Sequence, residues 1–349
     1  MKLNEALELI RQPDSKAMDE SRKRWDSIAK PLRSLGRMEE AVIKIAGIAG
    51  DSQVVLDKKA HVVMCGDNGV VEEGVSQSGS EVTAIVAENF LQVKSCVSIM
   101  CRMQGVDLFP VDVGMCSETR IIPRKIAYGT KNMAKEPAMT RQQAVDAIEV
   151  GIDMVRELKE KGYNLIGTGE MGIGNTTTSS AVTSALLGVD VESVTGKGAG
   201  LSSSALNKKI QVIKNAIELH RPDPLDPVDV LAKVGGFDIA GLMGVFIGGA
   251  AFRVPVVIDG FISSVSALLA SRLDSRITGY MLASHVSQEP ASVMLLEELG
   301  LNPLLVCDMR LGEGTGAVAS FPILDIALEI YNKMSTFEQI ELDAYEELE

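Results

Sequence analysis

Two glutamates stand among glycines in this sequence, at positions 170 and 313. Glu313 lies in Leu311-Gly-Glu-Gly-Thr-Gly316, so its neighbours carry no side chains and a ligand ring can approach its carboxylate. Exclusion of water from such a position raises the pKa of a carboxyl group, which makes Glu313 a candidate general base near neutral pH. The alternative is a flexible loop with a solvated glutamate.

Glu170 belongs to the glycine-rich stretch Gly-Thr-Gly-Glu-Met-Gly-Ile-Gly-Asn-Thr-Thr-Thr at 167–178. An apolar run at 163–166 predicts a buried strand before this stretch, and small apolar residues at 179–187 predict a helix after it. A glycine-rich turn between a strand and a helix is typical of phosphate binding, because backbone N–H groups at the helix start point at the anion. Asn175 and the three threonines that follow are expected to cap the helix and to supply donors.

The carboxylate of Glu170 does not suit a simple phosphate site, because it repels an anion. It suits a ligand that places a ribose hydroxyl or a cationic ring at this point. The alternative is a tight strand-to-helix connection whose glycines adopt positive φ, since a single glycine-rich turn is a weak signal.

A second glycine-rich loop at 195–200 precedes a predicted helix at 204–219. Lys197 and Lys209 are the cations nearest the two glycine-rich loops and are candidates to meet a phosphate, although exposed lysines are common. His285 either binds a ligand or is satisfied by local hydrogen bonds at a strand end.

Acidic residues also follow several predicted strands, at Asp67, Asp112, Glu170 and Asp259, with Glu313 after the last strand. Ligands of open parallel sheets bind at the carboxyl ends of the strands, so this rim favours a ligand with hydroxyls or positive charge. For Asp67 and Asp112 we favour the simpler interpretation that each caps the following helix.

The predicted elements alternate between strands and helices. Strands are expected at 60–65, 107–113, 163–166, 254–258, 280–285 and 303–308, and helices at 4–11, 15–28, 37–49, 81–103, 140–161, 179–187, 204–219, 228–234, 239–252, a Ser/Ala-rich segment after 260, and one near the C-terminus. This alternation predicts an α/β fold with a mainly parallel sheet covered by helices on both faces. The acidic C-terminal tail is expected to be a solvated end.

Composition excludes several classes of protein. The chain has 349 residues, 46% of them hydrophobic, and a net charge of −13, which argues against binding to nucleic acid or to an anionic membrane surface. Five cysteines and three histidines form no zinc-binding pattern, so we expect reduced thiols and no metal. The N-terminus has no signal-peptide core, and the uncharged run at 239–252 is shorter than the about 18 residues that span a bilayer. A cytoplasmic location is predicted.

No nucleophile of a known pattern is present. Gly-x-Ser-x-Gly, a recognisable Cys/His pair and a Walker lysine are all absent from the sequence. The expected chemistry uses a bound nucleotide, one glutamate as base and preorganised donors, with no cofactor and no covalent intermediate.

Six motifs, in order, resemble those of the nicotinate-nucleotide:dimethylbenzimidazole phosphoribosyltransferases. They are Ser34-Leu-Gly-Arg37, Asp67-Asn-Gly-Val70 with Glu73-Gly-Val75, Gly169 to Thr177, Lys233-Val-Gly-Gly-Phe-Asp238, Asp259-Gly-Phe261 and Arg310 to Gly316. The resemblance runs from about Lys30 to the C-terminal helix. It implies a Rossmann-like large domain at 60–313, a small helical domain formed by 1–59 plus 314–349, and a homodimer.

The resemblance also implies an activity in the assembly of the lower ligand of cobalamin. The phosphoribosyl group of nicotinate mononucleotide would pass to 5,6-dimethylbenzimidazole or a related base, with inversion at C1′ and release of nicotinate. Glu313 matches the family's general base, and Glu170 matches an acidic residue at the ribosyl side that stabilises positive charge at C1′.

The remaining site residues are carried over by the same resemblance. The nucleotide and chiefly its phosphate are assigned to Gly172, Asn175, Thr176, Gly198, Lys209 and Ser287, the ribose to Asp259, and the base pocket to Ser78, Val86 and Leu311. The chain departs from the family at Asn68, where histidine is more frequent, at Thr178–Ser180, where Pro-Ala-Ala is usual, and at Arg33, where glycine is common. Val86 stands where some relatives carry a glutamine that faces the base, which leaves the acceptor open between dimethylbenzimidazole, another benzimidazole, adenine and a phenol. A nucleotide-binding protein without activity is the third hypothesis.

Overall fold

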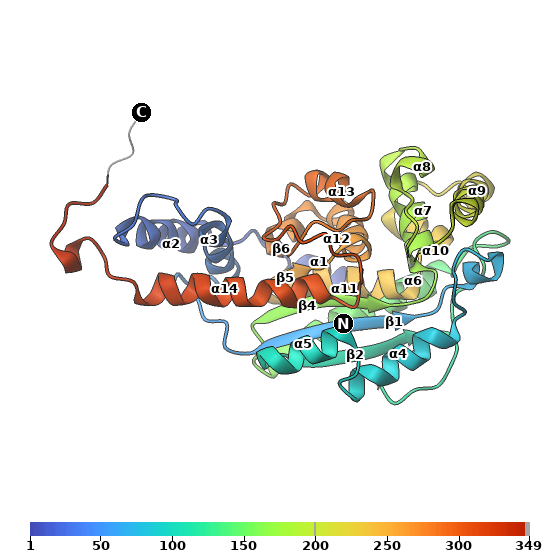
Figure 1. The fold of residues 1–349 in the computed structure, drawn as a ribbon, viewed down its shortest axis with the longest axis horizontal. Helices are drawn as coiled ribbons and strands as arrows, with labels where there is room; N and C mark the ends of the chain where they lie inside the picture. Colours follow the sequence, from blue (N-terminus) through green and yellow to red (C-terminus); the bar gives the residue numbers. More distant parts are fainter. Residues whose placement is uncertain (199, 346–349) are drawn as a thin grey trace.

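The computed structural model of the chain describes residues 1–198 and 200–345, so residue 199 of the second glycine-rich loop and the last four residues of the acidic tail lie outside the described part. Six parallel strands form one sheet in the order β3-β2-β1-β4-β5-β6 (Figure 1). The strands are β1 (Lys59–Gly66), β2 (Asp107–Gly114), β3 (Ile122–Pro123), β4 (Leu165–Met171), β5 (Val256–Ile258) and β6 (Met281–Ala283). The order of the strands reverses between β1 and β4, which is where open α/β sheets place their ligands.

Helices cover both faces of the sheet, as the alternating pattern predicted. In β1, Ala60, Val62 and Met64 enter one hydrophobic core, whereas Val63 and Cys65 enter a second core on the opposite face. The first face packs against α6 (Arg141–Glu160), α11 (Phe237–Phe252) and α12 (Phe261–Leu273). The second packs against α4 (Glu81–Leu91), α5 (Cys96–Gln104) and α14 (Thr315–Lys333). Strands buried on both faces are rich in apolar residues, which is why they were recognisable as hydrophobic runs, although β1 and β4 also carry buried His61 and Glu170.

The other helices lie around this layered core. They are α1 (Leu3–Leu9), α2 (Ser15–Ser27), α3 (Arg37–Ala49), α7 (Asn175–Leu187), α8 (Val191–Val194), α9 (Ser203–His220), α10 (Pro227–Val234) and α13 (Ser292–Glu298), with short 3₁₀ helices at Gly69–Glu73, Ser275–Tyr280 and Glu338–Ile340.

The long helix α14 joins the sheet to the N-terminal helices (Figure 1). Its first half packs against β4 and α5. Its second half reaches α3 and also Trp25 of α2, whose ring lies 5.0 Å from that of Tyr331. By contrast, α1 packs against α6 and α11, and the amino group of Met1 pairs with Asp153 at 2.8 Å. The division into a domain at 60–313 and a helical domain at 1–59 plus 314–349 remains a prediction.

The predicted helix 81–103 is in fact two helices. Val93 adopts a left-handed φ of 53°, and the Ser95 hydroxyl accepts a hydrogen bond from the Ser98 amide at 3.2 Å, which starts a new helix. By length and composition alone, Glu81–Gln104 is apolar enough to cross a membrane, the one such stretch in the described part of the chain, and 33% of it is buried. The break at 92–95 divides that stretch into two short helices.

The strand predicted at 303–308 is wrong. Only an isolated parallel bridge between His285 and Leu305 extends the sheet there. Pro303 has no N–H to donate, and Asp308 has a left-handed φ of 53°, so the segment cannot continue an extended ladder. The segment 280–285 does contain β6.

Candidate active site

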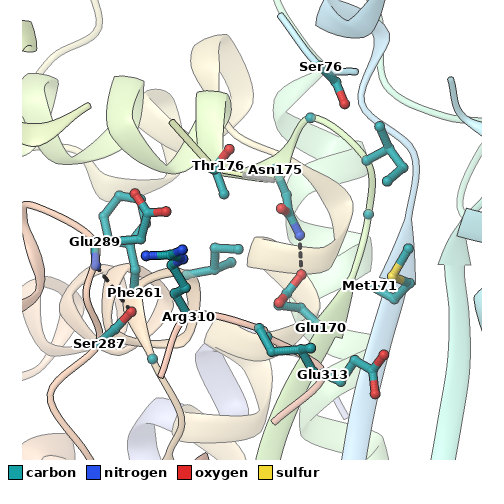
Figure 2. A pocket seen from close by; sticks show the side chains of 18 of the residues that line it. Ser76, Glu170, Met171, Asn175, Thr176, Phe261, Ser287, Glu289, Arg310 and Glu313 are labelled. Atoms are coloured by element: carbon teal, nitrogen blue, oxygen red, sulfur yellow. Dashed lines mark hydrogen bonds between the residues drawn. The ribbon is translucent and has the colours of Figure 1, made fainter. Parts of the chain in front are cut away.

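A cavity of about 300 Å³ lies beside the carboxyl ends of β4 and β5, and both Glu170 and Glu313 line it (Figure 2). The two carboxylates that sequence reasoning singled out therefore face one cavity. Most of the other predicted site residues line it as well, namely Val86, Gly172, Asn175, Thr176, Gly198, Asp259, Ser287 and Leu311. Lys209 and Ser78 do not line the cavity; Ser76 and Gln77 do.

The strand β4 is longer than predicted, so Glu170 lies on a strand and the turn begins only at Gly172. The glycines of β4 serve close packing. A Cβ atom at Gly169 would clash with the carbonyl oxygen of Glu313 and lie 2.8 Å from Nε2 of His61. The absence of side chains on this face of β4 therefore lets the Glu313 loop dock on the strand.

The Glu313 loop has an unusual backbone. Gly312, Glu313 and Gly314 adopt left-handed φ values of 89°, 60° and 86°, a region that a glutamate occupies only when its surroundings hold it there. His61, fully buried on β1, donates from Nε2 to the carbonyl oxygen of Glu313 at 2.8 Å. Burial lowers the pKa of His61 to about 4, so this ring is neutral at physiological pH. Sequence reasoning missed His61, because nothing in its neighbourhood marks a partner so far along the chain.

The carboxylate of Glu313 meets the start of α5. Its Oε2 accepts a hydrogen bond from the Val97 amide at 3.0 Å. Burial raises the pKa of Glu313, and the hydrogen bonds from the first turn of α5 partly oppose this rise. A partly buried carboxylate with a raised pKa suits a general base, as the glycine-flanked position predicted. The helix break at 92–95 is what creates this N-terminus.

Glu170 is held by Asn175. The Asn175 amide nitrogen donates to Oε2 of Glu170 (Figure 2). It also donates to Oδ2 of Asp238, at 3.0 Å. Burial, and next the charge of Asp238, raise the pKa of Glu170 to about 8. The expectation that Asn175 and its threonines cap α7 is wrong, because Gly174 is the N-cap and no side chain caps it. Asp238 is a further polar residue of this region that sequence reasoning did not select.

Lys209 lies behind the cavity wall. It is fully buried, and its Nζ donates to the hydroxyl of Thr176 at 2.8 Å and to the carbonyl oxygen of Gly196 at 3.2 Å. Burial lowers its pKa to about 8. Lys209 therefore orients the Thr176 hydroxyl and places positive charge under the second glycine-rich loop, where Gly198 packs against Thr176.

Three charged residues line the cavity at this end: Lys197, Glu289 and Arg310 (Figure 2). Lys197 was a candidate, whereas Arg310 and Glu289 were not. Oε2 of Glu289 is buried without a hydrogen-bond partner, and burial raises its pKa against the opposing charges of Lys209 and Arg310. Arg310 belongs to the motif that contains Glu313. A charged residue close to these glycines is the signal that could have marked it as a site residue.

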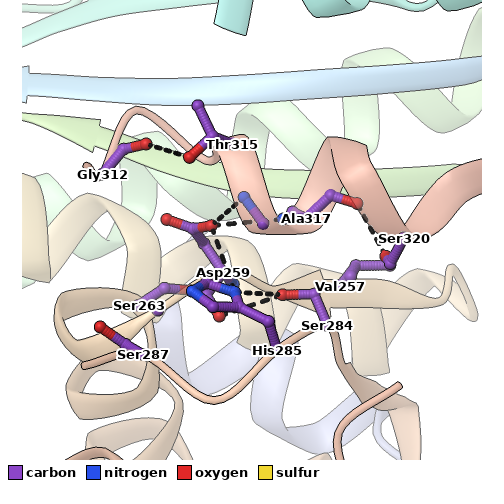
Figure 3. Close-up of polar contacts among 12 residues, drawn as sticks. Val257, Asp259, Ser263, Ser284, His285, Ser287, Gly312, Thr315, Ala317 and Ser320 are labelled. Carbon is purple, nitrogen blue, oxygen red and sulfur yellow. Dashed lines mark hydrogen bonds and ion pairs between the residues drawn. The ribbon is translucent and has the colours of Figure 1, made fainter. Parts of the chain in front are cut away.

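Asp259 ties the cavity to α14. Its Oδ1 accepts from the amides of Gly316 at 2.7 Å and Ala317 at 3.2 Å, in the first turn of that helix (Figure 3). Burial raises the pKa of Asp259 to about 7, although these hydrogen bonds lower it. His285 lines the cavity with Nδ1 4.0 Å from Asp259 and 3.1 Å from the Ser284 hydroxyl. His285 therefore has the local partner that one interpretation predicted, and its binding of a ligand stays a prediction although it lines the cavity.

Asp67 and Asp112 do not cap helices, contrary to our expectation. Oδ2 of Asp67 accepts from the Cys116 amide at 2.8 Å, and Oδ1 of Asp112 accepts from the Met115 amide at 2.9 Å. Both carboxylates thus hold the loop that follows β2. Neither lines the cavity, so the rim of acids predicted along the sheet is reduced to its three members at Glu170, Asp259 and Glu313.

One part of the cavity wall is apolar. It is formed by Val75, Val86, Met171, Ile173, Leu201 and Leu311. An aromatic acceptor would bury its ring there, next to Glu313. Within residues 1–198 and 200–345, no group of three or more His, Cys, Asp or Glu side chains is arranged to hold a metal ion.

Comparisons with known proteins agree with this architecture. The sequence profile of a phosphoribosyltransferase family matches residues 10–341. The chain is 49% identical to the nicotinate-nucleotide–dimethylbenzimidazole phosphoribosyltransferase of Ruminiclostridium cellulolyticum, with 100% of both chains covered, and 50% identical to that of Acetivibrio thermocellus over 97% of this chain and 96% of the other. The crystal structure of CobT from Thermus thermophilus superposes with a TM-score of 0.89 at 36% identity, covering 95% of this chain and 100% of that one. The chain therefore belongs to this phosphoribosyltransferase family.

Proposed function

We propose that this protein transfers the 5-phosphoribosyl group of nicotinate mononucleotide to 5,6-dimethylbenzimidazole or a related base, as its relatives' names state for them. The product would be the α-riboside 5′-phosphate of the base, which enters the nucleotide loop of cobalamin. The observation that carries the proposal is the meeting of Glu170 and Glu313 in one cavity with an apolar wall.

The chemistry proposed for the two carboxylates follows from charge. The nicotinate ring is cationic while bonded to C1′ and leaves as a neutral pyridine, so C1′ becomes positive as the bond breaks. An ionised Glu170 stabilises that charge in a water-poor site, where electrostatic interactions are strong. Glu313 accepts the proton from one azole nitrogen of the acceptor while the other nitrogen attacks C1′ from the face opposite to nicotinate. The result is inversion of configuration.

The phosphate of the nucleotide is proposed to lie at the end of the cavity formed by Gly172, Thr176 and Gly198. Lys197 and Arg310 line that end and offer positive charge, and buried Lys209 adds more through Thr176. This binding anchors the sugar, so that C1′ reaches the two carboxylates with little further loss of freedom. Ser287 and Asp259 lie between the phosphate end and the Glu313 loop as candidate contacts for the nucleotide.

The test is release of nicotinate from nicotinate mononucleotide in the presence of dimethylbenzimidazole. Glu313→Gln, which keeps size and polarity, is expected to lose most of the turnover while the dissociation constant of the nucleotide stays within about threefold, because the base acts on the acceptor. Glu329→Gln, an exposed glutamate of α14, is the matched control. Full activity of Glu313→Gln would refute the general-base role, and binding without nicotinate release by the wild type would favour the non-catalytic hypothesis.

A second candidate function keeps the reaction and changes the acceptor. Val86 presents no hydrogen-bonding group to the apolar wall. Acceptors that carry no polar group besides the reacting one, such as other benzimidazoles or a phenol, should therefore compete with dimethylbenzimidazole. Adenine should compete poorly. Incubation with equal amounts of these acceptors, followed by analysis of the ribosylated products, separates the alternatives.

Assembly and location belong to the same proposal. We expect a homodimer, which light scattering of the purified protein tests by its mass. We expect the protein in the cytoplasmic fraction of its cell, which fractionation tests.

A further inference from the structure

A group of buried polar side chains lies beneath the cavity and connects to Glu170. Asn175 donates one hydrogen to Oε2 of Glu170 and the other to Oδ2 of Asp238. Asp238 is fully buried at the first turn of α11. Because one amide serves both carboxyl groups, the position of Asp238 determines where Asn175 can hold Glu170.

The other oxygen of Asp238 has no donor. Oδ1 of Asp238 and Oδ1 of Asn68 are both buried without a hydrogen-bond partner. A Cβ atom at Gly236 would lie 2.5 Å from each of them, so both oxygens face the same small space. A hydrogen between these two neighbouring acceptors would stabilise both, because an unpaired buried acceptor is costly.

Rotation of the Asn68 amide does not remove this mismatch. In the present orientation, Nδ2 of Asn68 donates to the carbonyl oxygen of Ile173 at 3.4 Å. The rotated amide would place its oxygen against that carbonyl and create the same conflict on the other side. A proton on Asp238 satisfies both ends of the Asn68 side chain.

The charges around Asp238 also favour a neutral form. The ionisable groups that face it are Asp67 and Cys65 from β1 and its end, and Glu170 from β4. Burial among these groups raises the pKa of Asp238 to about 7. Asn175 and the nearby backbone N–H groups of Asp238 and Ile239 partly oppose this effect, because they stabilise the ionised carboxyl group. The pKa of Glu170 is raised further, to about 8, so Asp238 ionises first while the cavity is empty. A cationic pyridinium in the cavity reverses this order, because Glu170 lines the cavity and Asp238 does not, so in the nucleotide complex Glu170 is the group that ionises.

We propose that Asp238 is a positioning residue for Glu170 that works as a neutral carboxylic acid. Its Oδ1 hydroxyl donates to Asn68 and its Oδ2 accepts from Asn175, which fixes the amide that holds Glu170. The pattern of one donor and one acceptor is the same as that of an asparagine side chain. This inference rests on the proposed function for the role of Glu170, but the protonation of Asp238 can be measured without turnover.

Kinetics of two variants test the positioning role. Asp238→Asn keeps the donor and the acceptor, and is expected to retain kcat within about fivefold of wild type. Asp238→Ala leaves Asn175 without its second acceptor, and is expected to lose about 100-fold in kcat, because misplacement of a catalytic group by about 1 Å has that effect. KM for the nucleotide is expected to change much less than kcat. Equal losses in both variants would overturn the proposal, and so would a folded Asp238→Ala with unchanged kcat.

The pH profile distinguishes the neutral from the ionised form. An ionised Asp238 would raise the pKa of Glu170, so its replacement by asparagine would move the acid limb of the kcat profile to lower pH. A neutral Asp238 has no such effect, and the acid limb of Asp238→Asn is expected to coincide with that of wild type. A clear shift to lower pH would overturn the proposal.

Infrared spectroscopy gives a readout that is independent of activity. A buried protonated carboxyl group has a C=O stretching band that a carboxylate lacks, and the wild-type minus Asp238→Asn difference spectrum at pH 6, with nicotinate mononucleotide bound, is expected to contain it. Asp67→Asn is the matched control, because Asp67 is a buried neighbour whose Oδ1 also lacks a partner. A band lost in Asp67→Asn and kept in Asp238→Asn would overturn the proposal. Absence of nicotinate release by wild type would refute the proposed function and leave this measurement valid.

Discussion

Replacement of His61 by leucine should free the Glu313 loop from the sheet. The leucine side chain removes the Nε2–H that donates to the carbonyl oxygen of Glu313 at 2.8 Å. Loss of a donor to a buried carbonyl costs about 1–3 kcal/mol, so we expect the free energy of unfolding at pH 7.5 to fall by that amount. The backbone of Glu313 has a left-handed conformation that its surroundings hold in place. Loss of the hydrogen bond to its carbonyl should therefore also let the carboxylate move, and kcat should fall by about 10- to 100-fold.

The pH dependence isolates His61 from the other effects of the substitution. With a folded pKa of about 4 and an unfolded pKa of about 6.5, His61 binds a proton in the unfolded state first as pH falls. Its contribution to stability is therefore present above pH 6.5 and is lost as pH falls toward 4. Between pH 7.5 and pH 5 this loss is about 2 kcal/mol.

The assay is urea unfolding of wild type and His61→Leu at the two pH values, which cancels the titration of all other groups in the double difference. Wild type should lose about 2 kcal/mol more than the variant. His61→Gln, which keeps an N–H donor without a titrating ring, should recover part of kcat while matching the leucine variant in its pH dependence. Equal pH dependence of wild type and His61→Leu would refute a buried neutral histidine.

Three further predictions concern the remaining parts of the site. The acid limb of the kcat profile should lie above the ordinary glutamate pKa, because burial raises the pKa of both Glu170 and Glu313 and turnover requires both in the ionised form, and a stopped assay across pH 4–10 measures it. Lys209→Met should raise KM for nicotinate mononucleotide by about tenfold or more through loss of charge behind Thr176, and should also lower the melting temperature, because the buried carbonyl of Gly196 loses its donor. Val86→Gln should change the ratio of products from adenine and dimethylbenzimidazole by about tenfold in favour of adenine, as measured by competition.

The sheet and most helices were predictable because buried strands and amphipathic helices leave strong periodic patterns. Two of the differences between the predicted and the observed elements have local causes. Nothing in the apolar pattern interrupts 81–103, so the break depends on the cap at Ser95, a signal of one residue type. The apolar run at 303–308 resembled a strand although it starts with proline and ends at left-handed Asp308.

At the site, the residue types predicted the chemistry more reliably than they predicted the geometry. Glycine beside glutamate correctly marked Glu170 and Glu313 as cavity residues. The same glycines were assigned to phosphate approach, whereas Gly169 makes room for the Glu313 loop. Lys209 was recognised as a cation, but its complete burial behind Thr176 depends on the tertiary contacts of α9, which the sequence does not display.

The short surface connection between α4 and α5 determines where the first turn of α5 lies. Residues 92–95 join the two helices without being helical, so their number sets where α5 starts. A change in length at 92–95 would therefore move the Val97 amide away from Glu313, to which it donates at 3.0 Å. Surface connections ordinarily tolerate insertions. The connection at 92–95 should accept changes of residue type but not changes of length, because its length sets the position of α5 relative to α4.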